Sequence, residues 1–141
     1  MNERSHRILV VDDNPEVREF LLETLREGGY QSEGVADGLE AIDRLKAGGW
    51  ELVLTDLQMP GLDGLALIRW LKENADQTPV ILVTGSTDHP ACAEAQAQGA
   101  RCLHKPFQVD ALLEAVGEVL GSSGGGNEPD PWETGGRWPQ A

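Results

Sequence analysis

Five short apolar runs, each followed by a segment with helical periodicity, dominate the first 120 residues of this chain. The runs lie at residues 8–11, 52–54, 80–83 and 101–103, with a weaker run at 31–36. The runs at 8–11, 52–54 and 80–83 are continuous rather than alternating, which is typical of strands that are covered on both faces. Strict alternation of strand and helix predicts an α/β fold, in which a parallel sheet carries helices on both faces.

The segments between the runs carry helix-start signals. Asn14 can cap a first helix whose first turn begins with Pro15, and Asp37 can cap a second helix with Glu40 three residues on. The spacing of apolar residues predicts a third helix over about 63–73. Each of these helices follows a strand, as the alternating fold requires.

The last two predicted helices differ in apolar content. The fourth, over about 90–99, is rich in alanine and has no large aliphatic residue, so we expect it to pack weakly. The fifth has a strong apolar stripe, made by Val109, Leu112, Leu113, Val116 and Leu120. A weakly packed fourth helix suits an element that shifts between two positions, although an ordinary short surface helix would show the same pattern.

Charge and length exclude several classes of function. The chain has 141 residues, with 11 Lys and Arg against 24 Asp and Glu, which gives a formal charge of −13. This charge disfavours nucleic acid as a partner. The aliphatic runs fall far short of the roughly 20 residues needed to span a bilayer, and residues 1–7 are polar and do not resemble a signal peptide. We expect a cytoplasmic protein with no membrane partner.

The composition changes near residue 121. Residues 1–121 can form one packed domain, whereas residues 122–141 are rich in Gly and Pro and have no aliphatic side chain larger than Ala. We expect this C-terminal tail to be disordered. Trp132 and Trp138 are unusual there, and they fit either a solvated tail, which we favour, or a short docking motif.

Two cysteines, Cys92 and Cys102, are present, and they form no CxxC motif. Two cysteines are too few for a disulfide framework, which fits a reducing compartment such as the cytoplasm. We interpret Cys102 as a small packing residue rather than a redox sensor.

Charged and polar residues follow four of the predicted strands. They are Asp12, Asp13, Asp56, Thr84 and Lys105. Each alone could serve only a turn or a solvated loop. The carboxyl ends of parallel strands share one edge of the sheet, so three carboxylates would be crowded there and would repel one another unless a cation is bound. The simplest such cation is Mg²⁺, which prefers oxygen ligands.

These residues carry a specific resemblance. The blocks Val-Val-Asp12-Asp13-Asn14, Asp56-Leu-Gln-Met-Pro-Gly-Leu-Asp-Gly64, Val-Thr84-Gly85 and Lys105-Pro-Phe stand in the order and spacing of a response-regulator receiver domain, the phosphoacceptor of two-component signalling. The resemblance covers residues 8–120 and is closest to the single-domain type. It implies a flavodoxin-like doubly wound (βα)5 fold with strand order 2-1-3-4-5.

The resemblance also implies roles for individual residues. Asp56 would take a phosphoryl group from a sensor histidine kinase or a histidine phosphotransfer protein, without turnover of an external substrate. Mg²⁺ would be held by Asp13, Asp56 and the backbone carbonyl of Gln58, and through water by Asp12. Lys105 and Thr84 would bind phosphoryl oxygens.

The implied output is a switch of the face built from the fourth helix, fifth strand and fifth helix. No output-domain pattern follows Leu120, so the signal would pass to a downstream protein target or onward in a phosphorelay. The family usually has an aromatic residue three positions before the lysine, where this chain has Cys102. The chain therefore lacks the aromatic residue of the family's switch at this position. The family also has a cis peptide before the residue equivalent to Pro106.

Three alternative functions fit the sequence less well. A non-cycling receiver-like scaffold is disfavoured by four intact site residues, which are Asp13, Asp56, Thr84 and Lys105. An aspartyl-phosphate phosphohydrolase needs a second aspartate two residues after the first, where this chain has Gln58. A flavodoxin would carry a Ser-, Thr- and Gly-rich phosphate loop after the first strand, where Asp12 and Asp13 would repel phosphate.

Overall fold

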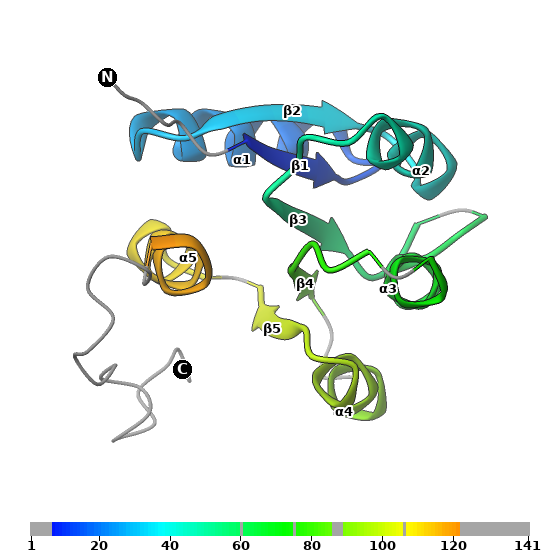
Figure 1. Cartoon of the computed structure of the whole chain (residues 1–141). Helices are drawn as coiled ribbons and strands as arrows, with labels where there is room; N and C mark the ends of the chain where they lie inside the picture. Colours follow the sequence, from blue (N-terminus) through cyan, green and yellow to red (C-terminus); the bar gives the residue numbers. More distant parts are fainter. Residues whose placement is uncertain (1–6, 60, 75, 86–88, 106, 122–141) are drawn as a thin grey trace.

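The fold is a five-stranded parallel sheet between two layers of helices (Figure 1). The computed structural model describes residues 7–59, 61–74, 76–85, 89–105 and 107–121. The elements are β1 (Arg7–Val11), α1 (Pro15–Glu27), β2 (Gln31–Val35), α2 (Gly38–Ala47), β3 (Leu52–Asp56), α3 (Gly64–Glu73), β4 (Val80–Thr84), α4 (His89–Ala97), β5 (Arg101–His104), α5 (Val109–Val116) and the π-helical turn η1 (Gly117–Gly121).

The strand order is β2-β1-β3-β4-β5, and every neighbouring pair is parallel. This confirms the predicted doubly wound topology. β2 and β5 are the two edge strands, so β5 has a partner on one side only. The tail at 122–141 lies outside the described residues, and its predicted disorder stays a prediction.

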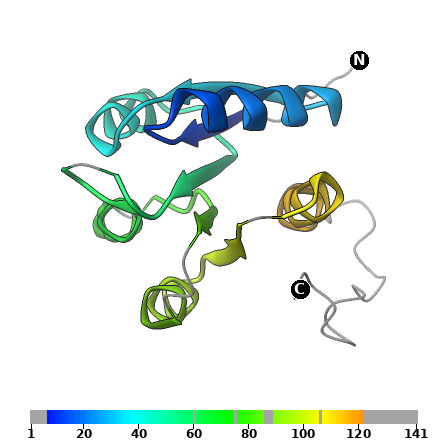
Figure 2. The ribbon, with the colours of Figure 1, turned by 180° about the vertical axis from the view of Figure 1, so that it is seen from behind.

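Alternate side chains of the strands pack into two separate hydrophobic cores, one on each face of the sheet. Leu9 and Val11 of β1 belong to a cluster that includes buried residues of α2, α3 and α4, whereas Ile8 and Val10 belong to a cluster with α1 and α5. Figures 1 and 2 show the same division, with α2, α3 and α4 on one side of the sheet and α1 and α5 on the other. The β1, β3 and β4 runs are continuous in apolar residues because both of their faces are covered.

The predicted helix starts are confirmed by their capping hydrogen bonds. The Asn14 side chain accepts from the backbone N–H groups of Glu16 and Val17 at 2.9 and 3.2 Å, and Asp37 accepts from the N–H of Glu40 at 2.8 Å. Helix α3 begins one residue later than the pattern indicated, because Asp63 is its cap.

The fifth helix departs from the sequence prediction at its end. Its regular α-helical turns stop at Val116, and the chain continues as η1 through Gly121. Gly117 stands at this change, and glycine has a low helix propensity. Val119 and Leu120 still pack against the α1–α5 core. Within the described residues, no helix is both long and apolar enough to cross a membrane.

Candidate functional site

Three carboxylates meet at the carboxyl end of the sheet. One oxygen from each of Asp12, Asp13 and Asp56 lies within 4.8 Å of the others. Asp56 is the last residue of β3, and Asp12 and Asp13 directly follow β1. The central pairing of β1 with β3 brings these ends together, as the sequence predicted.

Lys105 faces two of these carboxylates from the end of β5. Its Nζ lies 3.9 Å from Asp12 Oδ2 and 3.6 Å from Asp56 Oδ1. The backbone N–H of Lys105 donates to the Thr84 carbonyl at 2.8 Å, which ties the ends of β4 and β5 together. Thr84 is buried at the end of β4, one residue beyond the position that pairs with Asp56. The predicted carboxylates, hydroxyl and ammonium therefore share one edge of the sheet.

Burial raises the pKa of two carboxyl groups of the site. It raises the pKa of Asp12, while the Asn14 N–H and Lys105 act in the opposite direction. Burial also raises the pKa of Asp56, where Lys105 lowers it and the nearby Asp12 charge raises it. Because the Lys105 ammonium lowers the pKa of both carboxyl groups against the effect of burial, a further cation beside them would act in the same direction.

One carboxylate oxygen of this site, Asp12 Oδ2, accepts no hydrogen bond from the described residues. Asp12 Oδ1 accepts from the Asn14 N–H at 2.9 Å, but no hydrogen bond to the buried Asp12 Oδ2 exists among the described residues. At 3.9 Å the Lys105 ammonium is too far away for a hydrogen bond. A buried carboxylate oxygen in this position is suited to coordinate a cation directly or through water.

The remaining predicted site residues lie around this edge. Gln58 is exposed, two residues after Asp56, and Gly85 lies beside Lys105, where an added Cβ would touch the lysine side chain at 3.8 Å. Ser86, Pro60 and Pro106, with the predicted cis peptide before Pro106, fall outside the described residues.

Glycine 64 has a structural role that the sequence analysis missed. A Cβ at Gly64 would lie 2.6 Å from the Asp56 carbonyl oxygen and 2.6 Å from Leu82 Cδ1. Glycine is therefore required where the first turn of α3 approaches the end of β3. The Gly-Leu-Asp-Gly run was visible in the sequence, but only the structure shows which backbone it approaches.

Arg18 was also missed. Its Nη1 donates to the Asp12 carbonyl at 2.7 Å, so α1 helps to position the acidic loop. The arginine stem passes over β2 at Gly34, where a Cβ would lie 2.9 Å from Arg18 Cδ. Arg18 lies one turn into the helix that follows Asp12. This spacing is the sequence feature that could have predicted its contact with the acidic loop.

The cysteine interpretation was wrong. Cys92 of α4 and Cys102 of β5 form a disulfide, with a Cα–Cα distance of 5.8 Å. The residues are ten positions apart, and only the packing of α4 on β5 brings them together. Cys102 does help to fill the core, as predicted, but not as a free thiol.

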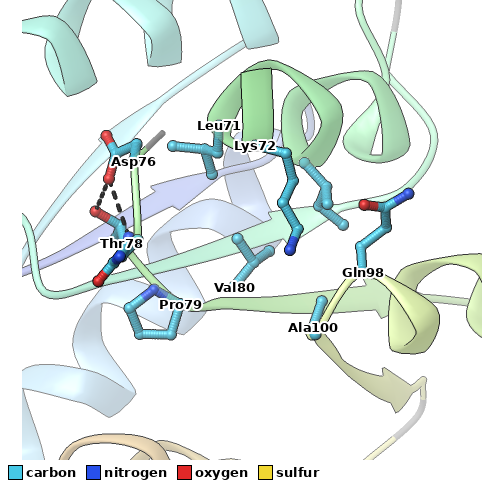
Figure 3. A pocket seen from close by; sticks show the side chains of 11 residues that line it. Leu71, Lys72, Asp76, Thr78, Pro79, Val80, Gln98 and Ala100 are labelled. Atoms are coloured by element: carbon cyan, nitrogen blue, oxygen red, sulfur yellow. Dashed lines mark hydrogen bonds between the residues drawn. The ribbon is translucent and has the colours of Figure 1, made fainter. Parts of the chain in front are cut away.

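A separate pocket of about 480 Å³ lies at the opposite, amino-terminal edge of the sheet, between α3 and the turn after α4 (Figure 3). Figure 3 shows Lys72 and Gln98 beside it, with Asp76 accepting hydrogen bonds from the Thr78 N–H and hydroxyl at 2.9 and 2.6 Å. None of the predicted site residues lines this pocket. The acidic cluster at the carboxyl end of the sheet is therefore separate from this pocket.

Comparison with known proteins identifies the family. The family model for the response regulator receiver domain matches residues 8–117. The chain belongs to the response regulator receiver family. This is a family of signalling domains in two-component systems rather than of enzymes that act on an external substrate, as the sequence analysis expected.

Receiver regions of transcriptional regulators are among the similar proteins. The C4-dicarboxylate transport transcriptional regulatory protein DctD of Pseudomonas aeruginosa is 38% identical over 116 residues, which cover 81% of this chain and 25% of that protein. The DNA-binding transcriptional regulator NtrC of Escherichia coli is 34% identical, with coverage of 80% and 24%. The chain therefore spans about a quarter of the length of these relatives.

Solved receiver structures share the fold. TrrA of Thermotoga maritima, solved in complex with Mg²⁺-BeF, has a TM-score of 0.75 at 33% identity and covers 82% of this chain and 99% of its own. The chemotaxis protein CheY4 of Vibrio cholerae has a TM-score of 0.77 at 29% identity, with coverage of 83% and 100%.

Proposed function

We propose that this receiver domain accepts a phosphoryl group on Asp56 from a phosphohistidine of a sensor histidine kinase or a histidine phosphotransfer protein. The observation that carries the proposal is the position of Lys105, whose ammonium faces both the Asp56 and Asp12 carboxylates. Its nearest carboxylate contact is Asp56 Oδ1, at 3.6 Å. A cation held there suits a group that gains negative charge when it reacts.

In the transfer, a carboxylate oxygen of Asp56 attacks the phosphorus atom. The oxygen–phosphorus bond forms as the phosphorus–nitrogen bond to the donor imidazole breaks, and the electron pair of that bond stays on the nitrogen. Asp56 must be ionised to react, and the Lys105 charge opposes the effect of burial on its pKa. Little other covalent chemistry is needed, because catalysis is mainly positioning and neutralisation of charge.

The donor set fits Mg²⁺. Asp12 Oδ2 is buried without a hydrogen bond among the described residues, and the three clustered carboxylates supply the oxygen atoms that this ion prefers. Asp13, Asp56 and the Gln58 backbone carbonyl would hold the ion, with Asp12 joined through water. When bound, Mg²⁺ neutralises charge on the carboxylates and on the phosphoryl oxygens.

Thr84 and Lys105 would respond to the new group. Phosphorylation adds about −1.5 to −2 charge and three acceptor oxygens at neutral pH. Thr84 would donate its hydroxyl to one oxygen and Lys105 would pair with another, while Gly85 leaves room beside the lysine. Because the Thr84 carbonyl is bonded to the Lys105 N–H, a shift of either strand end is passed to the other.

The response would reach partners through the surface of α4, β5 and α5. A downstream protein target, or the histidine of a further phosphotransfer protein, would bind this surface in a phosphorylation-dependent way. The net charge of −13 disfavours direct binding of this chain to nucleic acid. We place the domain in the cytoplasm, where sensor kinases present their phosphohistidine, with no membrane partner.

The test is covalent labelling with acetyl phosphate, followed by intact-mass measurement. The wild type should gain one acid-labile phosphoryl group only when Mg²⁺ is present, and the Asp56→Asn variant should gain none. Asp43→Asn, which changes an exposed aspartate on α2, is the matched control and should label like the wild type. Undiminished labelling of Asp56→Asn would falsify the assignment.

A further inference from the structure

A disulfide between α4 and β5 stands apart from the phosphoacceptor chemistry. It joins Cys92, on the buried side of α4, to Cys102, on the edge strand of the sheet. The Cα–Cα distance of 5.8 Å lies within the normal range for a disulfide. The backbone positions of the two residues therefore suit a disulfide.

The surroundings of the pair suit thiol chemistry. The Nε2 atom of His104 lies 3.5 Å from Cys92 Sγ, and His104 is exposed beside the largely buried sulfur atoms. A hollow of about 330 Å³ opens next to Cys102 and is lined by Gln96, Gly99, Ala100, Arg101 and Cys102. The hollow gives a small oxidant or reductant in solvent access to Cys102, and the exposed His104 places a base beside the Cys92 sulfur atom.

We propose that Cys92 and Cys102 form a reversible redox site that a hydroperoxide oxidises and a dithiol reduces. In this site His104 takes the proton of the Cys92 thiol, which then attacks the peroxide as a thiolate. The first step forms a sulfur–oxygen bond and breaks the oxygen–oxygen bond, giving a sulfenic acid on Cys92 and, with hydrogen peroxide, one water.

Cys102 completes the oxidation. Its sulfur attacks Cys92 Sγ, the sulfur–sulfur bond forms, and the sulfur–oxygen bond breaks with release of a second water that carries the Cys102 proton. Two thiols thus lose two protons and two electrons, and the peroxide gains them. A dithiol reverses the change by thiol–disulfide exchange and is itself oxidised to a disulfide.

A metal site is the less favoured interpretation of the same residues. Cys92, Cys102 and His104 bring one ligand atom each to within 4.8 Å of one another. Structural zinc sites use four protein ligands, whereas this cluster has three among the described residues, and its two sulfur atoms are bonded to each other.

The consequence of the redox site is control of α4. The buried side chains of this helix are Ala91, Cys92 and Ala95, so they offer little apolar area to hold it. On its outer side, Glu94 pairs with Arg69 of α3 at 2.7 Å, but that pair is exposed to solvent. Oxidation therefore holds α4 against β5, and reduction leaves the helix freer to move. The effect on signalling rests on the proposed function, because that proposal assigns α4 to the responding surface.

Counting thiols in the full-length chain tests the redox site. After treatment with hydrogen peroxide, denaturation and alkylation, the protein should carry no alkyl group, and after dithiothreitol it should carry one on each cysteine. A second peroxide treatment should restore the unlabelled form. Two alkylated cysteines after peroxide, or oxidation that dithiothreitol does not reverse, would overturn the proposal.

The rate of disulfide formation tests whether His104 acts as the base. His104→Gln should slow formation of the disulfide by hydrogen peroxide about tenfold or more, because the base is lost, while the oxidised end state stays the same. Glu94→Gln, which lies on α4 like Cys92 but pairs with Arg69 of α3, should oxidise at the wild-type rate. An unchanged rate in His104→Gln would remove the base from the proposal. Thiols of the reduced protein that resist alkylation until a zinc chelator is added would show a metal site instead and overturn the redox assignment.

Hydrogen exchange tests the control of α4. The α4 amides of the reduced protein should exchange about tenfold faster than those of the oxidised protein, and the α1 amides should exchange equally in both. Equal exchange of α4 in the two states would overturn the coupling. Both readouts should be the same in Asp56→Asn, so failure of phosphorylation and failure of the redox site are distinguished.

Discussion

Helices α1 and α4 cover opposite faces of one sheet by different means. Helix α1 buries Leu21, Leu22 and Leu25, and its start is capped by Asn14. Helix α4 has no large aliphatic residue and is joined to β5 by a disulfide. The comparison indicates that α1 is held by the hydrophobic effect, whereas much of the attachment of α4 is covalent and depends on redox conditions.

The largest loss of stability should come from a substitution in α1. Leu25 is fully buried against β1 and α5, and Leu25→Ala should lower the free energy of unfolding by about 3 to 4 kcal/mol, through lost burial and the cavity left behind. Chemical denaturation measures this change. A loss no larger than that caused by reducing the disulfide would break the proposed difference between the two helices.

Reduction of the Cys92–Cys102 disulfide should have the next largest effect. The bond closes a short loop, so dithiothreitol should lower the free energy of unfolding by roughly 2 to 3 kcal/mol in the chain-entropy account. Thermal melts with and without reductant measure it. The double variant Cys92→Ala with Cys102→Ala is the control, and its melting temperature should not respond to reductant.

Introducing a glycine into α4 should lower the free energy of unfolding by less than reduction of the disulfide does. Ala95→Gly removes a fully buried methyl group and lowers helix propensity, for a loss of about 1 to 2 kcal/mol. Gln96→Gly, at the neighbouring exposed position, should cost only the propensity part, about 1 kcal/mol. Denaturation of both variants separates the two contributions. Equal losses would mean that α4 gains nothing from burial of Ala95.

The smallest change in stability is expected for Asp12, at the carboxyl end of the sheet. Burial raises the pKa of Asp12, so its contribution to stability is full below the ordinary aspartate pKa and is lost as the pH rises through the raised value. Asp12→Asn should therefore stabilise the Mg²⁺-free protein at pH 7 by about 1 kcal/mol, or a few degrees in Tm. The gain should fade in acid. Asp43→Asn should show no such gain, and a destabilised Asp12→Asn would contradict this electrostatic account.

Most of the fold could be predicted from local signals. The apolar runs of β1, β3 and β4 are continuous because both faces are buried, and Asn14 and Asp37 cap the helices whose starts they indicated. The acidic cluster could be predicted as well, because parallel strands that end in Asp12 and Asp56 must bring those residues to one edge.

Features that depend on tertiary distance could not be predicted in this way. The disulfide joins residues with no motif spacing, and its formation depends on how α4 lies on β5. The need for glycine at position 64 depends on how closely α3 approaches Asp56, which no local pattern reports. The π-helical end of α5 was missed because its apolar stripe continues through Leu120 in either helix type.

The hydrogen bond from the Gly64 N–H to the Leu57 carbonyl, at 2.9 Å, closes the segment between them into a ring. The ring is anchored where it leaves β3, and Leu62 within it lies against Gly38 of α2 rather than against the acidic cluster. The Leu57 N–H also donates to the Val83 carbonyl at 2.9 Å, so this segment is tied to the sheet where it leaves β3, and we expect replacement of the exposed Gln58 side chain to leave the position of Asp56 unchanged.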